Sequence, residues 1–340
     1  MRVSDPVNRK HKALPILERF RRGTNMTPTS SRGTTPATPA DEVAPWRFRS
    51  AGAALIRTVA ADAARGPGAR GDARWTPSPP RIQLRPPIFI VGAPRSGTTY
   101  LGDAVGRLAS VAYHFEPVAT KYAAQRFATG SWGSAQTAKY LRSAYWLLVA
   151  SRLEWGRRLC DKTPQASFLV SVLAEHFPDS QFVHIVRDGR DAAVSYRERP
   201  WLRQDSSAVL RFEPGGGRWG PYPRFWTEAD RQEEFRTTSD LHRCIWAWRR
   251  FTEAAAGQSA QLPEGRLLTV RYEHLVSDPH AVGQRLAEFL GEPRSATSLM
   301  NHLAATANPA SVGRWRQLSR DEQSVLTDEA GTLLADLGYL

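Results

Sequence analysis

The sequence is poor in the features that place a protein outside the cell or within a membrane. It contains two cysteines, Cys160 and Cys244, which are too few for a disulfide framework and form no zinc-ligand pattern. No apolar run reaches the length of about 20 residues that spans a bilayer, and the basic N-terminus lacks the apolar core of a secretory signal. We therefore expect a cytoplasmic protein in a reducing environment, at most peripheral to the inner face of the membrane.

Acidic residues are scarce in only one part of the chain. Residues 1–85 hold 16 Lys and Arg against 6 Asp and Glu, whereas the remaining residues hold 30 against 27. The formal net charge of +13 therefore comes mostly from the N-terminal part. The nearly neutral remainder lacks the broad basic face that duplex binding requires, and it carries no helix-turn-helix or zinc-finger signature. We expect no nucleic acid partner.

The N-terminal part divides into three segments. Residues 1–45 are rich in Thr, Ser, Pro and Arg, which predicts a disordered basic tail. Residues 46–64 carry apolar side chains at helical spacing with arginines between them, which predicts an amphipathic helix. Residues 65–81 are typical of a linker. The helix could pack on its own domain, pair two subunits as a homodimer, or make weak contact with an anionic membrane surface, and we prefer the first interpretation.

The remainder, residues 82–340, is predicted to be one domain in which strands and helices alternate. Such alternation is typical of a parallel sheet with right-handed crossovers. We predict an α/β, P-loop-like three-layer fold, with a central parallel sheet flanked by helices. The predicted strands are Ile88–Val91, Val111–Tyr113, Gln181–Val186 and Arg266–Val270. The predicted helices are Thr98–Leu108, Gln165–His176, Asp191–Arg197, Leu241–Ala256, His280–Leu290 and Ser319–Ala330.

The clearest chemical signal is the loop between the first predicted strand and helix. Gly92 and Gly97 bound this loop with the spacing of a P-loop. Backbone N–H groups and the positive end of a helix dipole converge on an anion at such a turn. Thr98 occupies the position of the lysine that a nucleotide triphosphatase needs, and Arg95 is the fixed cation of the loop. The loop therefore predicts a phosphate site, but not one for the γ-phosphate of ATP.

A second anion site is predicted after the strand Gln181–Val186. Arg187 stands at the end of this strand, and Ser195 follows on the next helix, for which Asp191 is the predicted N-cap. A planar guanidinium forms bidentate bonds to phosphate oxygens, so the arginine and the serine can close on one anion from two sides. Ligands of parallel sheets lie beyond the carboxyl ends of the strands, where both motifs fall.

The PRSGTT loop resembles the 5′-phosphosulfate loop of sulfotransferases that use 3′-phosphoadenosine 5′-phosphosulfate (PAPS). The resemblance implies that PAPS is the co-substrate and that the 3′-phosphate is bound by Arg187 and Ser195. It also implies that the 5′-phosphosulfate is bound by Pro94, Arg95, Ser96, Gly97, Thr98 and Thr99. Two later segments, Arg271–Pro279 and Ser311–Arg316, also resemble the family. The second of them implies that Ser311 and Arg314 complete the nucleotide site.

The resemblance also implies a catalytic set. In the branch that carries PRSGTT and includes tyrosylprotein sulfotransferases, a glutamate follows the loop arginine by some twenty residues, as Glu116 follows Arg95 here. Glu116 is therefore the predicted base, with a pKa raised by partial burial, and His114 is the reserve candidate. Lys162 matches the family lysine that contacts the bridging oxygen or the sulfuryl group, and Arg95 is placed for the leaving 5′-phosphate. No metal is expected, because arginine and lysine can supply the positive charge.

The acceptor is not identified by any motif. Residues 199–238 show no clear periodicity, contain three consecutive glycines and several aromatic residues, and are typical of a lid over an acceptor. Aromatic rings stack on many ligands, and we favour a hydroxyl of a carbohydrate, a glycolipid or a secondary metabolite over a protein tyrosine. Two other classes remain open: a small-molecule or nucleotide kinase, although its P-loop lysine and metal-binding aspartate are missing, and a non-catalytic nucleotide-binding protein.

Overall fold

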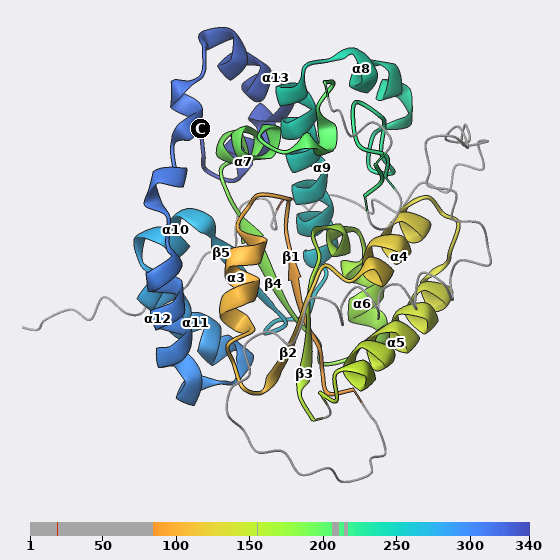
Figure 1. Ribbon diagram of the computed structural model, residues 1–340, viewed down its shortest axis with the longest axis vertical. Helices are drawn as coiled ribbons and strands as arrows, with labels where there is room; N and C mark the ends of the chain where they lie inside the picture. Colours follow the sequence, from red (N-terminus) through yellow and green to blue (C-terminus); the bar gives the residue numbers. More distant parts are fainter. Residues whose placement is uncertain (1–18, 20–83, 155, 206–210, 214–216) are drawn as a thin grey trace, which may run out of the picture.

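The computed structural model describes Arg19 and residues 84–154, 156–205, 211–213 and 217–340. At its centre lies a five-stranded parallel sheet with the order β2-β3-β1-β4-β5 (Figure 1). The strands are β1 (Ile88–Val91), β2 (Val111–Phe115), β3 (Arg158–Lys162), β4 (Gln181–Val186) and β5 (Leu267–Arg271). Because β1 and β4 are parallel neighbours, the loops that follow them open side by side at the same edge of the sheet.

Helices cover both faces of the sheet, so the sheet is the middle one of three layers (Figure 1). One face is covered by α3 (Thr98–Val105), α10 (Tyr272–Ser277), α11 (Pro279–Leu290) and α12 (Ala296–Thr306). The other is covered by α4 (Val118–Ala128), α5 (Ser134–Ser151) and α6 (Val170–His176). A third core, next to the end of β4, is formed by α7 (Gly189–Arg197), α8 (Gln232–Thr237), α9 (Asp240–Ser259) and α13 (Arg320–Asp336). The predicted three-layer α/β fold is confirmed.

Short 3₁₀ turns connect several of these elements. They are η1 (Pro164–Phe168), η2 (Pro200–Leu202), η3 (Ala229–Arg231), η4 (Pro293–Ser295), η5 (Pro309–Ser311) and η6 (Arg314–Gln317). The turn η1 precedes α6, so the single helix predicted over 165–176 is in fact divided in two.

The central strand β1 is buried on both faces. Ile88 and Ile90 pack in the core under α3 and α11, whereas Phe89 and Val91 pack in the core under α5 and α6. A strand with two buried faces has no polar side, which explains its continuous apolar sequence. Its burial fixes the point at which the following loop leaves the sheet.

The sequence-based prediction missed β3, α4, α5, α8, α10 and α12. The strand β3 reads Arg-Leu-Cys-Asp-Lys, and its last two residues, Asp161 and Lys162, are fully buried. Charged residues are rarely buried without a partner, so a periodicity argument assigns such a segment to the surface. Of the predicted strands, β5 begins one residue later than expected and β2 ends two residues later.

The predicted N-cap of α7 is also wrong. Asp188 caps this helix, since its carboxylate accepts a hydrogen bond from the backbone N–H of Arg190. Asp191 lies in the first turn and has another role: its carboxylate accepts bonds from the backbone N–H groups of Gly313 (2.7 Å) and Trp315 (3.1 Å). Asp191 is buried, and its two hydrogen bonds attach the segment around η6 to helix α7.

The predicted N-terminal segments lie almost entirely outside the described residues. This applies to the amphipathic helix 46–64, the linker 65–81 and the tail 1–45, except for Arg19. The guanidinium of Arg19 pairs with the carboxylate of Asp336 on α13. Among the described residues, no helix combines the length and apolarity needed to cross a membrane.

Candidate active site

The loop after β1 has a backbone geometry that requires its glycines. Gly92 and Gly97 have φ values of +144° and +94°. A Cβ atom would lie 2.4 Å from the carbonyl oxygen of Ile185 at the first position and 2.4 Å from the ring of Tyr272 at the second. Gly97 is the N-cap of α3, and no side chain caps this helix. The first N–H groups of α3 are therefore available to an anion at the positive end of the helix.

The second predicted anion motif meets this loop directly. Arg187 donates hydrogen bonds to the carbonyl oxygens of Arg95 (2.9 Å) and Ser311 (2.5 Å), and its guanidinium stacks on the ring of Tyr272 at 4.3 Å. Arg95 Nε in turn donates to Ser195 Oγ at 3.1 Å. The structure thus brings together, within one group of contacts, residues that the sequence motifs place about a hundred positions apart.

These contacts leave buried hydrogen-bonding capacity unused. Among the described residues, Ser96 Oγ and Arg187 Nε are buried and have no hydrogen-bond partner. Burial lowers the pKa of Arg95, and the nearby charges of Arg199 and Arg187 lower it further. An unpaired buried donor and a group of like charges both cost free energy. A bound anion would relieve both costs, so this end of the site fits a phosphate group.

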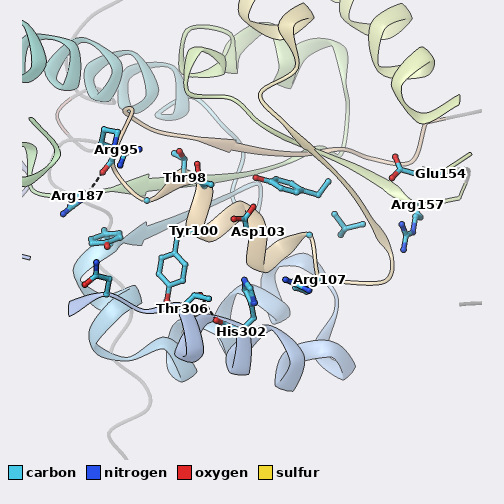
Figure 2. A pocket seen from close by; sticks show the side chains of 17 residues that line it. Arg95, Thr98, Tyr100, Asp103, Arg107, Glu154, Arg157, Arg187, His302 and Thr306 are labelled. Carbon is cyan, nitrogen blue, oxygen red and sulfur yellow. Dashed lines mark hydrogen bonds between the residues drawn. The ribbon is translucent and has the colours of Figure 1, made fainter. Parts of the chain in front are cut away.

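A cleft of about 590 Å³ extends from this anion site along α3. Arg95 and Arg187 lie at one end and Glu154 and Arg157 at the other, with Tyr100 between them (Figure 2). The ring of Tyr100 packs edge to face with that of Tyr272, with centroids 6.4 Å apart. The loop residues that line the cleft are Arg95, Gly97, Thr98 and Thr99. The cleft therefore offers aromatic surface directly beside the anion site.

A second group of charged residues lies where β2 and β3 end. Lys162 Nζ donates to Glu116 Oε1 (2.8 Å) and to Thr99 Oγ1 (3.1 Å), which links the group to the loop. Lys121 Nζ contacts the other carboxylate oxygen, Glu116 Oε2, at 2.6 Å. Glu116 and Arg95 both have positive φ values, 46° and 67°, and non-glycine residues in this conformation are strained and are common at functional sites. The structure thus connects the predicted base and the predicted lysine to the PRSGTT loop, residues 94–99, which is called the anion loop below.

The pKa of Glu116 differs from the prediction. Burial alone would raise it, but the charges and hydrogen bonds of Lys121 and Lys162 outweigh burial and lower the pKa to about 2. The expected upward shift is therefore wrong for this arrangement, because the sequence did not reveal the second lysine. Burial also lowers the pKa of Lys162, an effect that Glu116 partly opposes. The carboxylate is ionised and ready to accept a proton, but it is a weak base while both lysines contact it.

Lys162 owes its position to its neighbour Asp161. The buried Asp161 carboxylate accepts hydrogen bonds from the hydroxyls of Thr120 (2.6 Å), Tyr145 (2.8 Å) and Thr163 (2.5 Å). These bonds tie the end of β3 to α4 and α5. Burial raises the pKa of Asp161, and the three hydroxyls oppose this rise. The Asp-Lys-Thr-Pro segment thus combines an anchor with the predicted catalytic lysine.

Three further residues of this group were missed by sequence reasoning. Lys121, Gln165 and Glu213 lie on α4, on η1 and in the predicted lid, respectively. Gln165 Nε2 donates to Glu213 Oε1 at 2.6 Å, and Lys121 Nζ lies 3.5 Å from the same oxygen. The helical position of Lys121, five residues after Glu116, was the available signal, but α4 itself was not predicted.

The reserve base, His114, is directed elsewhere. It is fully buried, and its Nε2 atom lies 3.1 Å from Glu154 Oε2. In the pairing of β2 with β3, His114 lies opposite Asp161 and Phe115 lies opposite Lys162. Because successive residues of a strand face opposite sides of the sheet, His114 and Lys162 lie on different faces. This placement favours Glu116 over His114 as the group that faces the reaction.

The last two predicted nucleotide ligands have different surroundings. Ser311 lies at the site: its carbonyl oxygen accepts from Arg187, and its hydroxyl lies 2.7 Å from the hydroxyl of Tyr272. Arg314 instead pairs with Glu198 at 2.5 Å, with its side chain 37% exposed, and it does not line the cleft. The structure therefore brings Ser311, but not Arg314, into contact with the residues that are predicted to bind phosphate.

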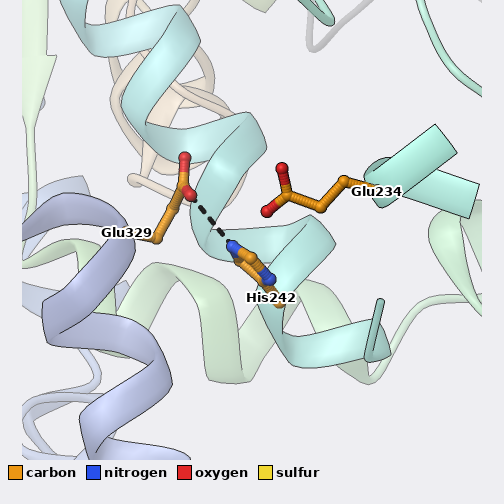
Figure 3. Close-up of side chains that lie close together, drawn as sticks. All are labelled: Glu234, His242 and Glu329. Carbon is orange, nitrogen blue, oxygen red and sulfur yellow. Dashed lines mark hydrogen bonds and ion pairs between the residues drawn. The ribbon is translucent and has the colours of Figure 1, made fainter. Parts of the chain in front are cut away.

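One cluster outside this site has the composition of a metal centre. Glu234, His242 and Glu329 converge between α8, α9 and α13 (Figure 3). Arg231 and Arg249, however, donate to both oxygens of Glu329, and Arg231 also pairs with Glu234. Burial raises the pKa of Glu329, but these partners and His242 lower it to about 2. The carboxylates are thus neutralised by protein cations, and we interpret the cluster as an ion-pair network.

Comparison with known proteins identifies the family. A family model described as the sulfotransferase family matches residues 86–209 and 224–297, more than half of the chain. This chain therefore belongs to the sulfotransferase family. The match contains the anion loop, the Arg187 motif and the residues around Glu116 and Lys162.

Individual relatives are more distant. Protein-tyrosine sulfotransferase 2 of Gallus gallus is 26% identical over 252 residues, which cover 70% of this chain and 58% of the relative. Protein-tyrosine sulfotransferase A of Caenorhabditis elegans is 24% identical over 221 residues, covering 61% and 50%. The chain thus spans about half the length of these relatives.

Solved structures of sulfotransferases are also similar. Sulfotransferase STF9 from Mycobacterium avium has a TM-score of 0.48 at 16% identity, covering 88% of this chain and 87% of that one. The sulfotransferase domain from the curacin biosynthetic pathway has a TM-score of 0.45 at 18% identity, covering 74% and 98%. Mouse sulfotransferase SULT7A1, solved with 3′-phosphoadenosine 5′-phosphate (PAP), has a TM-score of 0.37 at 14% identity, covering 75% and 91%.

Proposed function

We propose that this chain transfers the sulfuryl group of PAPS to a hydroxyl group of an acceptor. The observation that carries the proposal is that the anion loop contacts both Arg187 and Ser195. In this group, the buried atoms Ser96 Oγ and Arg187 Nε have no hydrogen-bond partner among the described residues. PAPS carries a phosphosulfate and a 3′-phosphate on one nucleoside, so it can supply anions to both motifs at once. Family membership supports this choice of donor.

Each part of the donor has a matching surface in the cleft. The loop residues Ser96 to Thr99 and the first N–H groups of α3 are assigned to the 5′-phosphosulfate. Arg187 and Ser195 are assigned to the 3′-phosphate, for which a guanidinium and a hydroxyl are suitable donors. The aromatic surface of Tyr100 and Tyr272 beside them is available to the nucleoside.

The reaction requires a proton acceptor and stabilisation of the leaving group. The acceptor oxygen forms a bond to sulfur while the bond from sulfur to the bridging oxygen breaks, and PAP leaves with that electron pair. Glu116 receives the proton of the acceptor hydroxyl. Lys162 and Arg95 stabilise the negative charge that develops on the bridging oxygen and the 5′-phosphate. Their positions beside Thr99 and in the loop support these roles.

The contacts of Lys162 connect charge stabilisation to base strength. Lys162 is shared between Glu116 and Thr99 in the structure. Attraction of its ammonium group to the sulfuryl or bridging oxygen would weaken its contact with Glu116, and the pKa of the carboxyl would then rise. The base would become stronger at the stage of the reaction in which the proton must move.

The acceptor is the second determinant of specificity, and we assign the predicted lid, which contains Glu213, to its binding. We propose a hydroxyl of a carbohydrate, a glycolipid or a secondary metabolite, with protein tyrosine as the alternative that the names of the two relatives suggest. Incubation of the protein with sulfur-labelled PAPS and panels of glycans, lipids, phenols and tyrosine peptides would identify it. Labelling of tyrosine peptides alone would reverse our preference.

Donor binding can be tested without any acceptor. PAP should stabilise the protein against thermal unfolding in the presence of a chelator, whereas 5′-AMP, which lacks the 3′-phosphate, should have a much smaller effect. Isothermal calorimetry with both nucleotides would give the affinities. Equal affinities for PAP and 5′-AMP, or stabilisation by ATP with Mg²⁺ but not by PAP, would contradict the proposal.

A further inference from the structure

Lys121 is a buried charge that the proposed reaction does not use. Its side chain is 9% exposed, and its Nζ atom lies between two carboxylates, 2.6 Å from Glu116 Oε2 and 3.5 Å from Glu213 Oε1. Lys162 already contacts the other oxygen of Glu116. The predicted base is therefore connected through one lysine to a carboxylate that belongs to the predicted lid.

Glu213 is held in place from two sides. The lid segment forms an antiparallel bridge between Phe212 and Arg218, and the backbone N–H of Trp219 donates to the carbonyl oxygen of Arg211 at 2.8 Å. On the protein side, Gln165 Nε2 donates to Glu213 Oε1 at 2.6 Å. Gln165 is buried on η1, directly after the segment that carries Lys162. The carboxylate is therefore presented to Lys121 at a defined place.

We propose that Lys121 is a positioning residue whose charge is divided between Glu116 and Glu213, so that Glu213 controls how strongly Glu116 binds a proton. The inference rests on the proposed function, in which Glu116 is the base. The attraction between two charges increases as their distance and the local dielectric constant fall. In this buried group, a small movement of Lys121 toward Glu213 makes Glu116 a stronger base, and the opposite movement makes it a weaker one.

Lys121, Glu116 and Glu213 share their surroundings with one further cation and three other titratable groups. Lys162 on β3 is the further cation, and the charge of Asp103 on α3 raises the pKa of Lys162. Tyr113 on β2 and Tyr196 on α7 are within electrostatic reach of Glu116, but burial raises the pKa of both phenols, which therefore stay neutral. The pKa of Lys121 is raised by Glu213 and Glu116 against the effect of burial, which keeps it charged.

The inference can be tested by titrating Glu116 directly. Carbon-13 NMR of protein labelled at the glutamate carboxyl carbon would follow the resonance that is lost in Glu116→Gln. The Lys162→Met background removes the second cation and so raises the titration of Glu116 into an accessible pH range. Adding Lys121→Met should raise the midpoint by at least about one pH unit, a tenfold change in proton affinity. Lys139→Met, at an exposed lysine of α5, is the matched control and should leave the midpoint unchanged.

The role of Glu213 requires a comparison of two backgrounds. Glu213→Gln should lower the Glu116 midpoint when Lys121 is present, because the lysine is then left to Glu116 alone. The same substitution should have a clearly smaller effect in the Lys121→Met protein. Equal shifts in the two backgrounds would show that Glu213 acts on Glu116 directly and would overturn the inference. A midpoint that Lys121→Met does not move would overturn it as well.

This titration needs neither PAPS nor an acceptor, so its result is separate from that of the proposed function. Binding of PAP and the thermal melt of each variant would show that the fold is intact. If Glu116→Gln retained full sulfuryl transfer while the titration gave the expected shifts, Glu116 would be excluded as the base but its coupling to Lys121 would stand. If the shifts were absent and Glu116→Gln were inactive, the coupling alone would fail.

Discussion

The part of the site that we assign to PAPS, here called the donor side, and the part around Glu116, here called the acceptor side, differ in how their cations are paired. On the donor side, Arg95 and Arg187 contact hydroxyl and carbonyl oxygens and have no carboxylate partner in these contacts. On the acceptor side, Lys121 and Lys162 are neutralised by Glu116, with Glu213 contacting Lys121 as well. We propose that a bound anion completes the donor side, whereas the charges of the acceptor side are already paired and would have to rearrange during the reaction. The two sides should therefore respond differently to mutation, to ligand and to pH.

The largest expected difference is in turnover. Glu116→Gln keeps the size of the side chain but removes its ability to accept a proton, so sulfuryl transfer should fall by roughly 100- to 10,000-fold. PAP affinity should change little, because Glu116 is assigned to the acceptor side. Rates with labelled PAPS and calorimetry with PAP would measure the two quantities. His114→Gln is the matched variant: an inactive His114→Gln beside an active Glu116→Gln would show that the wrong base was assigned.

The acceptor side should also be sensitive to acid. The pKa of Glu116 is about 2 in the folded protein, below its usual value of about 4.3 in an unfolded chain. The resulting stabilisation, up to about 3 kcal/mol, is complete above the unfolded pKa and is lost as the pH falls toward 2. Urea unfolding between pH 5 and 3 should therefore show a shallower loss of stability in Glu116→Gln than in the wild type. Parallel curves would mean that the lysines do not hold the carboxylate in solution.

A buried histidine provides an internal reference for that experiment. Burial lowers the pKa of His184, on β4, to about 4, and neither of its ring nitrogens has a hydrogen-bond partner among the described residues. Between about pH 6.5 and 4, the unfolded chain binds a proton at this histidine and the folded protein does not. Stability should therefore fall as the pH decreases through this range, by about 3 kcal/mol in total. His184→Leu should remove this step and leave the lower one. If the stability of His184→Leu depended on pH in the same way as that of the wild type, this prediction would be wrong.

On the donor side, the expected effect is in nucleotide affinity. Arg187→Ala should weaken PAP binding by about 1.5–3 kcal/mol, the range for hydrogen bonds to charged groups, while binding of 5′-AMP should hardly change. Arg314→Ala is the control, because this partly exposed arginine already pairs with Glu198 and an exposed pair contributes about 1 kcal/mol or less. A loss in Arg314→Ala as large as that in Arg187→Ala would support Arg314 as a nucleotide ligand.

The smallest effect is expected from the N-terminal residues. Both sides of the site are formed by residues after position 84, so a protein that begins at Arg81 should remain folded and bind PAP as the full chain does. Calorimetry and a thermal melt would test this. Aggregation, or loss of a cooperative transition, would show that the predicted helix over 46–64 is part of the core.

The two sides also differed in how well the sequence predicted them. The donor side follows from short motifs, because a glycine-bounded loop and an arginine at the end of a strand create an anion site wherever they occur. Its parts are brought together by the pairing of β1 with β4, and the apolar runs of both strands indicate that each of them is buried. Arg314 was the exception, since its exposed pairing with Glu198 could not be derived from a motif.

The acceptor side depends on contacts that no local pattern contains. Lys121, Gln165 and Glu213 come from a helix, a 3₁₀ turn and the predicted lid, and their charges matter only because the fold buries them together. The polar sequence of β3 concealed the strand that positions Lys162. As a result, Glu116 was predicted but its low pKa was not, because that shift comes from the contacts of Lys121 and Lys162 with the same carboxylate.

The Asp191 carboxylate, which receives the backbone N–H groups of Gly313 and Trp315, has a consequence for the kinetics of the catalytic cycle. It fastens the segment over 308–317, of which Asn308 lines the cleft, to the same helix that carries Ser195. Arg187 fastens the segment a second time through the carbonyl of Ser311. If Arg187 binds the 3′-phosphate, as we propose, entry of PAPS and departure of PAP would disturb its contact with Ser311. Under this proposal the same few bonds would determine both nucleotide affinity and nucleotide exchange, so tighter binding of the donor would also slow the release of PAP.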